Sequence, residues 1–114
     1  MASCIFCEIA AGRLPADIVH RDDLVTAFRD TNPQAPTHIL VIPNEHVTSA
    51  AELGDARGAL AGRIFAVARD LAEREGILDS GYRLVTNVGR DAGQSVAHLH
   101  FHLLGGRRFR WPPG

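Results

Sequence analysis

Short segments of mainly apolar residues recur along the chain, and each ends at a proline, a glycine or charged residues. Their length, their alternation and these boundaries predict β-strands. We expect strands over 18–20, 24–28, 38–42, 82–88 and 96–104. The charged residues between the first two strands predict a hairpin, and two prolines before the third predict a loop.

One long helix is predicted over 55–74, where apolar residues recur at spacings of four, three and four. The apolar stripe comprises Leu60, Ile64, Val67 and Leu71. We expect Asp55 to cap the N-terminus of this helix and Gly76 to end it. Strands grouped before and after a single long helix indicate an α+β fold with a mainly antiparallel sheet.

The composition is that of one ordinary globular domain spanning 1–114. The chain has 114 residues, 46% of them hydrophobic and 22% charged, which allows a core without disulfide staples. With a formal net charge of −1, its basic cluster of Arg107, Arg108 and Arg110 is too small to predict a nucleic-acid or membrane partner. No apolar run approaches the ~20 residues of a membrane span, and a signal-peptide pattern is missing. We therefore expect a cytoplasmic protein.

Two cysteines, Cys4 and Cys7, form a C-x-x-C motif near the N-terminus. A structural disulfide is not expected in a reducing cytoplasm. The spacing suits metal binding or redox chemistry, but the motif alone does not decide whether it binds anything.

Three histidines alternate with apolar residues in the last predicted strand: His98, His100 and His102. Side chains alternate between the faces of a strand, so the three imidazoles should share one face. One histidine there would be an ordinary structural residue, whereas three idle buried imidazoles would each need hydrogen-bond partners. A three-histidine zinc site is the rival interpretation. At about 3.3 Å per residue the outer Cα atoms lie ~13 Å apart, which suits an extended phosphate ester better than one metal ion.

A polar loop with two glycines precedes the histidines. Gly93, Gln94 and Ser95 offer backbone N–H groups that can approach an anion without obstruction by side chains, and Ser95 adds a hydroxyl. Such a loop is commonplace by itself. Beside the histidines it favours a phosphate-binding function.

Residues 98–104 follow the pattern His-φ-His-φ-His-φ-φ, with φ an apolar residue, which resembles the signature of the histidine-triad family. Further segments resemble the branch of histidine triad nucleotide-binding proteins: 30–38, 93–96, 103–106 and 111–114. The likeness covers nearly the whole chain. Two positions depart from it, because Ala97 stands where an aromatic residue is expected and Arg110 where close relatives tend to carry histidine.

The resemblance implies a dimeric histidine-triad fold, with a five-stranded, mainly antiparallel sheet, one long helix and a short second helix. It also implies hydrolysis of purine nucleoside 5′-phosphoramidates, of the adenosine monophosphoramidate type, without a catalytic cofactor. The alternatives are a dinucleoside polyphosphate hydrolase, a zinc-dependent hydrolase and a nucleotide-binding regulatory module.

By the same resemblance, His100 is the nucleophile, and His102 binds the phosphoryl oxygens from the same face. A neutral imidazole has a nitrogen lone pair with which it can attack phosphorus. His38 either completes the polar cluster and helps to set the tautomer of a triad member, or is a plain strand-edge histidine. Ser95 and Asn87 contact the phosphate or the leaving group.

The likeness also implies the rest of the substrate site. Asp30 accepts hydrogen bonds from ribose hydroxyls, unless it serves only to form the turn. Backbone N–H groups around Gly93, Gln94 and Val96 stabilise the charge that grows in the transition state. The base lies between three apolar residues of a kind that is often plain core: Ile18, Phe28 and Leu40.

Some bacterial-type relatives carry an N-terminal C-x-x-C motif and bind zinc there. The resemblance adds His46 and His98 to Cys4 and Cys7 as the four ligands of a tetrahedral site. Such a closed site would be structural and would leave the other two triad histidines free.

Overall fold

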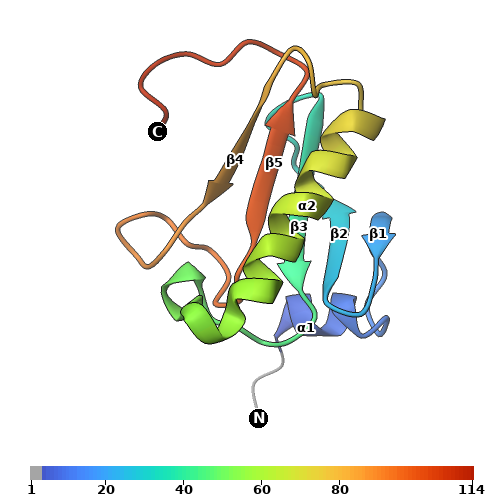
Figure 1. Ribbon diagram of the computed structural model, residues 1–114, viewed down its shortest axis with the longest axis vertical. Helices are drawn as coiled ribbons and strands as arrows, with labels where there is room; N and C mark the ends of the chain where they lie inside the picture. Colours follow the sequence, from blue (N-terminus) through green and yellow to red (C-terminus); the bar gives the residue numbers. More distant parts are fainter. Residues whose placement is uncertain (1–3) are drawn as a thin grey trace.

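The computed structural model describes residues 4–114, which form a five-stranded antiparallel sheet with a helix on each face (Figure 1). The strands pair in the order β1-β2-β3-β5-β4, and every neighbouring pair is antiparallel. Their bounds are β1 Ile18–Arg21, β2 Val25–Arg29, β3 Thr37–Pro43, β4 Tyr82–Thr86 and β5 Phe101–Gly105. The α+β class, the five strands and the first hairpin are thereby confirmed.

The long helix α2 (Gly58–Arg74) packs across one face of the sheet (Figure 1). It begins later than predicted, because a 3-10 turn, Asp55–Arg57, comes first. The predicted cap is therefore wrong: the cap position is Arg57, whose side chain makes no capping hydrogen bond. Gly58 in the first turn has low helix propensity, which favours the tighter turn before it. Gly76 ends the helix as predicted, with a φ of 74° that other residues rarely adopt.

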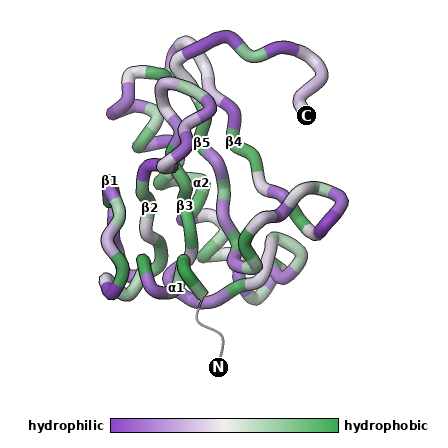
Figure 2. Tube along the Cα trace, turned by 180° about the vertical axis from the view of Figure 1, so that it is seen from behind, coloured by the Kyte–Doolittle hydropathy of each residue, from purple (hydrophilic) through white to green (hydrophobic). Residues whose placement is uncertain are grey.

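The short helix α1 (Ile5–Ala10) lies on the opposite face of the sheet (Figure 2). Two apolar clusters follow from this arrangement, because side chains alternate along each strand. The larger cluster packs the predicted stripe of α2 against one face of the sheet. The smaller cluster packs α1 against the other and comprises Phe6, Ile9, Phe28, Leu40 and Ile42. No helix within residues 4–114 combines the length and apolar character that a bilayer crossing needs.

The strand β5 is shorter than predicted, because it begins at Phe101 rather than at residue 96. Its continuation would have to pair with Pro43, which has no N–H to donate. The carbonyl of Pro43 instead accepts the ring N–H of His98 at 2.9 Å, and the N–H of Leu99 donates to the carbonyl of Val47 at 2.6 Å. The triad therefore crosses the beginning of the strand rather than lying within it.

Candidate active site

The face of the sheet that carries α1 holds a cavity of about 600 Å³. Its apolar part includes Ile5, Phe6, Ile9, Leu14, Phe28 and Leu40. Its polar part includes Asp30, Thr31, Ser95, His100 and His102. A cavity with these two parts suits a ligand that joins a hydrophobic ring to polar or charged groups.

His100 is buried, and its own backbone segment sets its tautomer. Nδ1 of the ring lies 2.7 Å from the carbonyl oxygen of His98. A carbonyl can only accept, so Nδ1 carries the proton, and Nε2 keeps its lone pair while the ring is neutral. Because His100 lines the cavity, it can offer this lone pair to a ligand as a nucleophile or a base.

A chain of hydrogen bonds fixes the tautomers of His38 and His102. The N–H of Gln34 donates to Nδ1 of His38 at 3.0 Å, so Nε2 carries the proton of the neutral His38 ring. This Nε2–H donates to Nδ1 of His102 at 2.9 Å. The remaining proton of neutral His102 is therefore on Nε2, where it can be donated to a ligand.

Burial keeps this histidine pair uncharged near neutral pH. It lowers the pKa of His38, although the carboxylate of Asp30, 3.5 Å away, acts in the opposite direction. The pKa of His102 falls to about 4, chiefly through burial and further through its histidine neighbours. His102 is thus a neutral hydrogen-bond donor under ordinary conditions.

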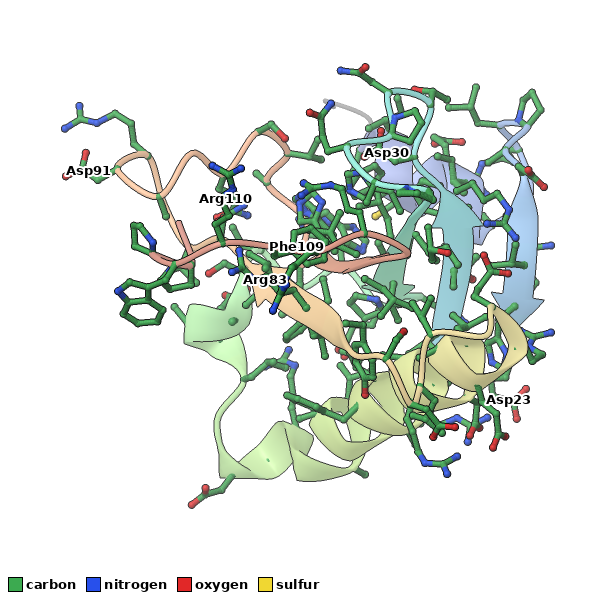
Figure 3. All side chains as sticks on the ribbon, turned by 90° about the horizontal axis from the view of Figure 1, so that it is seen from above. Asp23, Asp30, Arg83, Asp91, Phe109 and Arg110 are labelled. Carbon is green, nitrogen blue, oxygen red and sulfur yellow. The ribbon has the colours of Figure 1, made fainter. Side chains whose placement is uncertain are left out.

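Asp30 follows β2 and lines the cavity on the side of the sheet away from α2 (Figure 3). Its Oδ1 accepts the N–H of Asn32 at 2.8 Å, so the carboxylate does form the turn. Its Oδ2 lies 3.5 Å from Nε2 of His38, too far for a strong hydrogen bond. One carboxylate oxygen therefore holds the loop, and the other can accept a hydrogen bond from a ligand.

Asp30, His38 and His102 also bring one ligand atom each within 4.8 Å of one another, a spacing that could hold a metal ion. Binding through Nε2 of His38 would require its proton to move to Nδ1. The N–H of Gln34 already donates to Nδ1 and opposes that change. The hydrogen bonds of this segment thus favour a histidine pair over a metal centre.

The loop before the triad is braced by the side chain of Gln94. Its Nε2 donates to the carbonyls of Thr48 and Val96 at 2.7 and 2.9 Å, and its Oε1 accepts the N–H of Gly89 at 2.9 Å. Ser95 lines the cavity. Several other predicted site residues do not line it among residues 4–114: Ile18, His38, Asn87, Gly93, Gln94 and Val96. Apart from His38, which acts through His102, their contacts with a substrate stay predictions.

Helix α1 is a part of the site that the sequence analysis missed. It supplies three apolar side chains to the cavity, Ile5, Phe6 and Ile9. The ring of Phe6 lies edge-on to Phe28, with 5.6 Å between centroids, and to His100, with 5.1 Å. The helical spacing of these apolar residues is a usable signal, but a helix of six residues gives little periodicity.

The structure brings together Cys4, Cys7, His46 and His98 at the N-terminal end of α1, with one ligand atom from each within 4.8 Å of the others. Both cysteines are free thiols. The Sγ–Nδ1 distances are 3.2 Å for Cys4–His98, 3.2 Å for Cys7–His46 and 3.4 Å for Cys7–His98. A tetrahedral zinc ion, with bonds of about 2.3 Å to sulfur and 2.0 Å to nitrogen, separates such atoms by about 3.5 Å. The donor set therefore fits zinc in number, type and spacing.

The surroundings of this cluster also suit a metal. Nε2–H of His98 donates to the carbonyl of Pro43 at 2.9 Å, which turns Nδ1 toward the sulfurs. Burial lowers the pKa of His98, so its ring stays neutral. Burial and the neighbouring Cys4 raise the pKa of the Cys7 thiol to about 11. A bound cation would be needed to hold that sulfur as a thiolate at neutral pH.

The two departures from the family pattern lie on the surface. Ala97 and Arg110 are both exposed, and neither lines the cavity among the residues described. The tail that carries Arg110 is held by Arg83 of β4 (Figure 3). The Arg83 guanidinium lies 5.0 Å from the ring centroid of Phe109 and donates to the carbonyl of Arg110.

Known proteins share both the sequence and the fold. The sequence pattern of the HIT domain family matches residues 11–109. The purine nucleoside phosphoramidase of Escherichia coli K12 is 52% identical over 103 residues, which cover 90% of this chain and 87% of that protein. An uncharacterised HIT-like protein of Synechococcus elongatus is 49% identical over 110 residues, or 96% of each chain.

Solved structures extend the similarity to the arrangement of the elements. A HIT family hydrolase from Legionella pneumophila superposes with a TM-score of 0.96 at 48% identity, covering 98% of this chain and 100% of that one. A histidine triad nucleotide-binding protein from Candida albicans gives a TM-score of 0.81 at 31% identity, covering 98% of this chain and 85% of that one.

Proposed function

Because the chain belongs to the HIT-domain family, the histidine-triad proteins, we propose that it hydrolyses purine nucleoside 5′-phosphoramidates of the adenosine monophosphoramidate type. One observation carries the proposal: the Nδ1–H of His100 is committed to the carbonyl of His98, which leaves Nε2 as a nucleophile. The similarity to the E. coli phosphoramidase supports this class of substrate. The chain acts as one histidine-triad domain spanning 1–114.

Hydrolysis takes two displacements at the 5′-phosphorus. In the first, Nε2 of His100 bonds to phosphorus while the phosphorus–nitrogen bond of the substrate breaks. The amine leaves with a proton that the hydroxyl of Ser95 relays from solvent. In the second, water attacks the nucleotidyl-imidazole, loses a proton to solvent and releases the nucleoside monophosphate. Two steps with a good nucleophile replace one slow attack by water.

Uncharged hydrogen-bond donors stabilise the negative charge that grows on the phosphoryl oxygens. His102 donates Nε2–H to one oxygen, and His38 holds the tautomer that makes this possible. Asn87 contacts the phosphate or the leaving group. Three residues of the preceding loop add backbone N–H groups: Gly93, Gln94 and Val96.

The nucleoside occupies the rest of the cavity. Oδ2 of Asp30 accepts hydrogen bonds from the ribose hydroxyls, while Oδ1 keeps the turn in place. The purine ring packs against Phe28 and Leu40, which are neighbours on adjacent strands and lie on the same face of the sheet. Ile18 packs against the same cluster and supports this wall.

A structural zinc ion is part of the proposal, held by Cys4, Cys7, His46 and His98. With four protein ligands it offers no open position to a substrate, so it clamps the N-terminal segment to the sheet. Catalysis itself uses no cofactor.

We also propose a homodimer that works in the cytoplasm. The residues of the edge strand β4 are all half-buried, and Phe65 of α2 remains 58% exposed. Apolar surface of this kind is typical of a subunit interface. The free thiols suit a reducing compartment. Light scattering should give about twice the chain mass of 12.3 kDa, and the mass of one chain would overturn the dimer.

The test of the function is release of adenosine monophosphate and ammonia from adenosine 5′-phosphoramidate. We expect its kcat/KM to exceed that for a dinucleoside polyphosphate by at least about tenfold. Preference for the polyphosphate, or no turnover of either compound, would overturn the proposal. The metal can also be stripped from a chain that stays folded. If kcat is then lost and returns when zinc is added, a zinc-dependent hydrolase is favoured instead.

A further inference from the structure

Helix α1 forms one wall of the cavity but is too short to be stable alone. It spans six residues, well below the length at which an isolated helix persists in water. Phe6 and Ile9 are buried, while Ile5 is 50% exposed. Near its C-terminal end, the guanidinium of Arg21 donates to the carbonyl of Ile9 at 3.0 Å. Its N-terminal end depends on the residues around Cys4.

The cysteine–histidine cluster of Cys4, Cys7, His46 and His98 lies at this N-terminal end. Cys4 is the N-cap of α1, and its sulfur accepts the N–H of Cys7 at 3.4 Å. His46 lies in the segment that follows β3, and His98 in the segment that precedes β5, so both are connected to central strands of the sheet. A cation bound by all four side chains would tie α1 to the middle of the sheet.

The ring of Phe6 connects this cluster to the cavity. It lies edge-on to the ring of His98, with 5.9 Å between centroids, and to that of His100, with 5.1 Å. It also lies 5.6 Å from the ring of Phe28 in the apolar wall. Phe6 therefore contacts the metal-site residue His98, the proposed nucleophile His100 and the proposed base-binding wall at Phe28.

We infer that the cysteine–histidine cluster positions the substrate site: a zinc-type divalent cation bound there holds α1 and Phe6 against the cavity and so sets the affinity for the purine base. This inference rests on the proposed nucleotide function. The base occupies the apolar part of the cavity that α1 helps to form. The ribose and phosphate are bound by Asp30 and His102, which β2 and β5 position independently of α1. The cation therefore acts on base affinity more than on sugar or phosphate affinity.

The test is calorimetric titration of the zinc-loaded and the chelator-stripped chain with adenosine monophosphate and with ribose 5-phosphate. We expect stripping to raise the Kd of adenosine monophosphate by about tenfold or more, as loss of a buried aromatic contact does, and that of ribose 5-phosphate by less than about twofold. Added zinc should restore the wild-type chain but not Cys4→Ser/Cys7→Ser. Val67→Ala, which weakens the core under α2, is the control for general destabilisation and should bind adenosine monophosphate normally.

A second variant tests the route through Phe6 in a metal-loaded chain. Phe6→Ala keeps all four ligands, so it should retain zinc, lose a similar factor in affinity for adenosine monophosphate and respond much less to stripping than the wild type. Two results would overturn the inference. One is a Kd of zinc-loaded Phe6→Ala for adenosine monophosphate within about twofold of the zinc-loaded wild type, and the other is the same result for the stripped wild type. Failure of the zinc-loaded wild type to bind adenosine monophosphate would overturn the proposed function instead.

Discussion

Backbone carbonyls decide which nitrogen each of the first two triad histidines presents. His98 donates Nε2–H to Pro43, whereas His100 donates Nδ1–H to His98. Neighbouring members of the triad therefore present opposite nitrogens. His98 turns Nδ1 to the cysteines, and His100 keeps Nε2 for the cavity. Two chemically identical side chains are thus suited to different tasks, one as a metal ligand and the other as a nucleophile.

Replacing the nucleophile should separate chemistry from binding. His100→Ala removes the nitrogen that bonds to phosphorus, so kcat should fall by at least about three powers of ten. Adenosine monophosphate should still bind, because only one contact is lost. Steady-state rates and calorimetry measure the two effects. More than about a tenth of wild-type activity in this variant would assign the nucleophile to another residue.

Asp30 should discriminate ribose from sugars that lack its hydroxyls. Asp30→Ala should weaken binding of adenosine monophosphate by ~1.5–3 kcal/mol, the value of a hydrogen bond to a charged group. The 2′,3′-dideoxy analogue should lose much less, because it has no hydroxyl to offer. Calorimetric titration of both ligands against both chains gives the comparison. Equal losses would limit Asp30 to its turn with Asn32.

The neutral state of His102 should make stability fall in mild acid. Its pKa of about 4 in the folded chain lies below the ~6.5 of a free imidazole. Between these values the unfolded chain binds a proton at His102 that the folded chain does not, so stability is full above pH ~6.5 and is lost as the pH falls toward ~4. From about pH 7 to about pH 5, Tm should therefore fall less in His102→Gln than in the wild type. Loss of metal affects both chains alike, so equal falls in Tm would contradict a half-buried His102 that stays neutral in the folded chain.

The sequence predicts which polar residues meet, but not how their protons are arranged. Alternation in the triad predicts that His100 and His102 share one face, and both line the cavity. The tautomer of His102 depends on the N–H of Gln34, because this N–H sets the tautomer of His38 and His38 in turn donates to His102. Such a chain forms only once β3 and β5 are paired, so no local pattern reveals it. Likewise, only the folded loop shows that the Gln94 side chain braces the loop through backbone groups.

At the scale of single elements, the N-terminal boundary of β5 shows that hydrophobic alternation alone does not predict where a strand begins. The alternating pattern continues from residue 96, yet the strand begins at Phe101. A strand needs a partner with free donors and acceptors, and Pro43 of β3 lacks the donor. The apolar stripe of α2 recurs over several turns and the hydrogen bonds of this helix are internal, so the sequence pattern alone predicts it.

The cluster that anchors α1 should contribute to thermal stability. We predict one zinc ion per chain, bound by two sulfur and two nitrogen donors, and a lower Tm for Cys4→Ser/Cys7→Ser. The kcat per folded molecule should change only modestly, because no open coordination position faces the substrate. Metal analysis, X-ray absorption and calorimetric unfolding measure these properties. If the chain is purified without chelator and contains no zinc, a metal does not anchor α1.

At the scale of the whole molecule, the fold class follows from the order of strands and helix, but the order within the sheet does not. β5 pairs between β3 and β4, although α2 and β4 separate it from β3 along the chain. This long-range pairing places Leu40 of β3 opposite His102 and so brings His38 within reach of the triad. Cys4 likewise meets His98 from the far end of the chain. Contacts between such distant segments leave no periodic signal in the sequence.

A nucleotide bound covalently to His100 is what distinguishes the proposed mechanism from direct attack by water. The measurement is intact-mass spectrometry after rapid mixing of the chain with adenosine 5′-phosphoramidate, with quenching in neutral denaturant because phosphorus–nitrogen bonds are labile in acid. We predict a transient species that carries one adenylyl group, located on residue 100 by fragmentation, and none in His100→Ala. A wild-type chain that turns over the substrate without ever carrying a nucleotide would contradict the covalent mechanism.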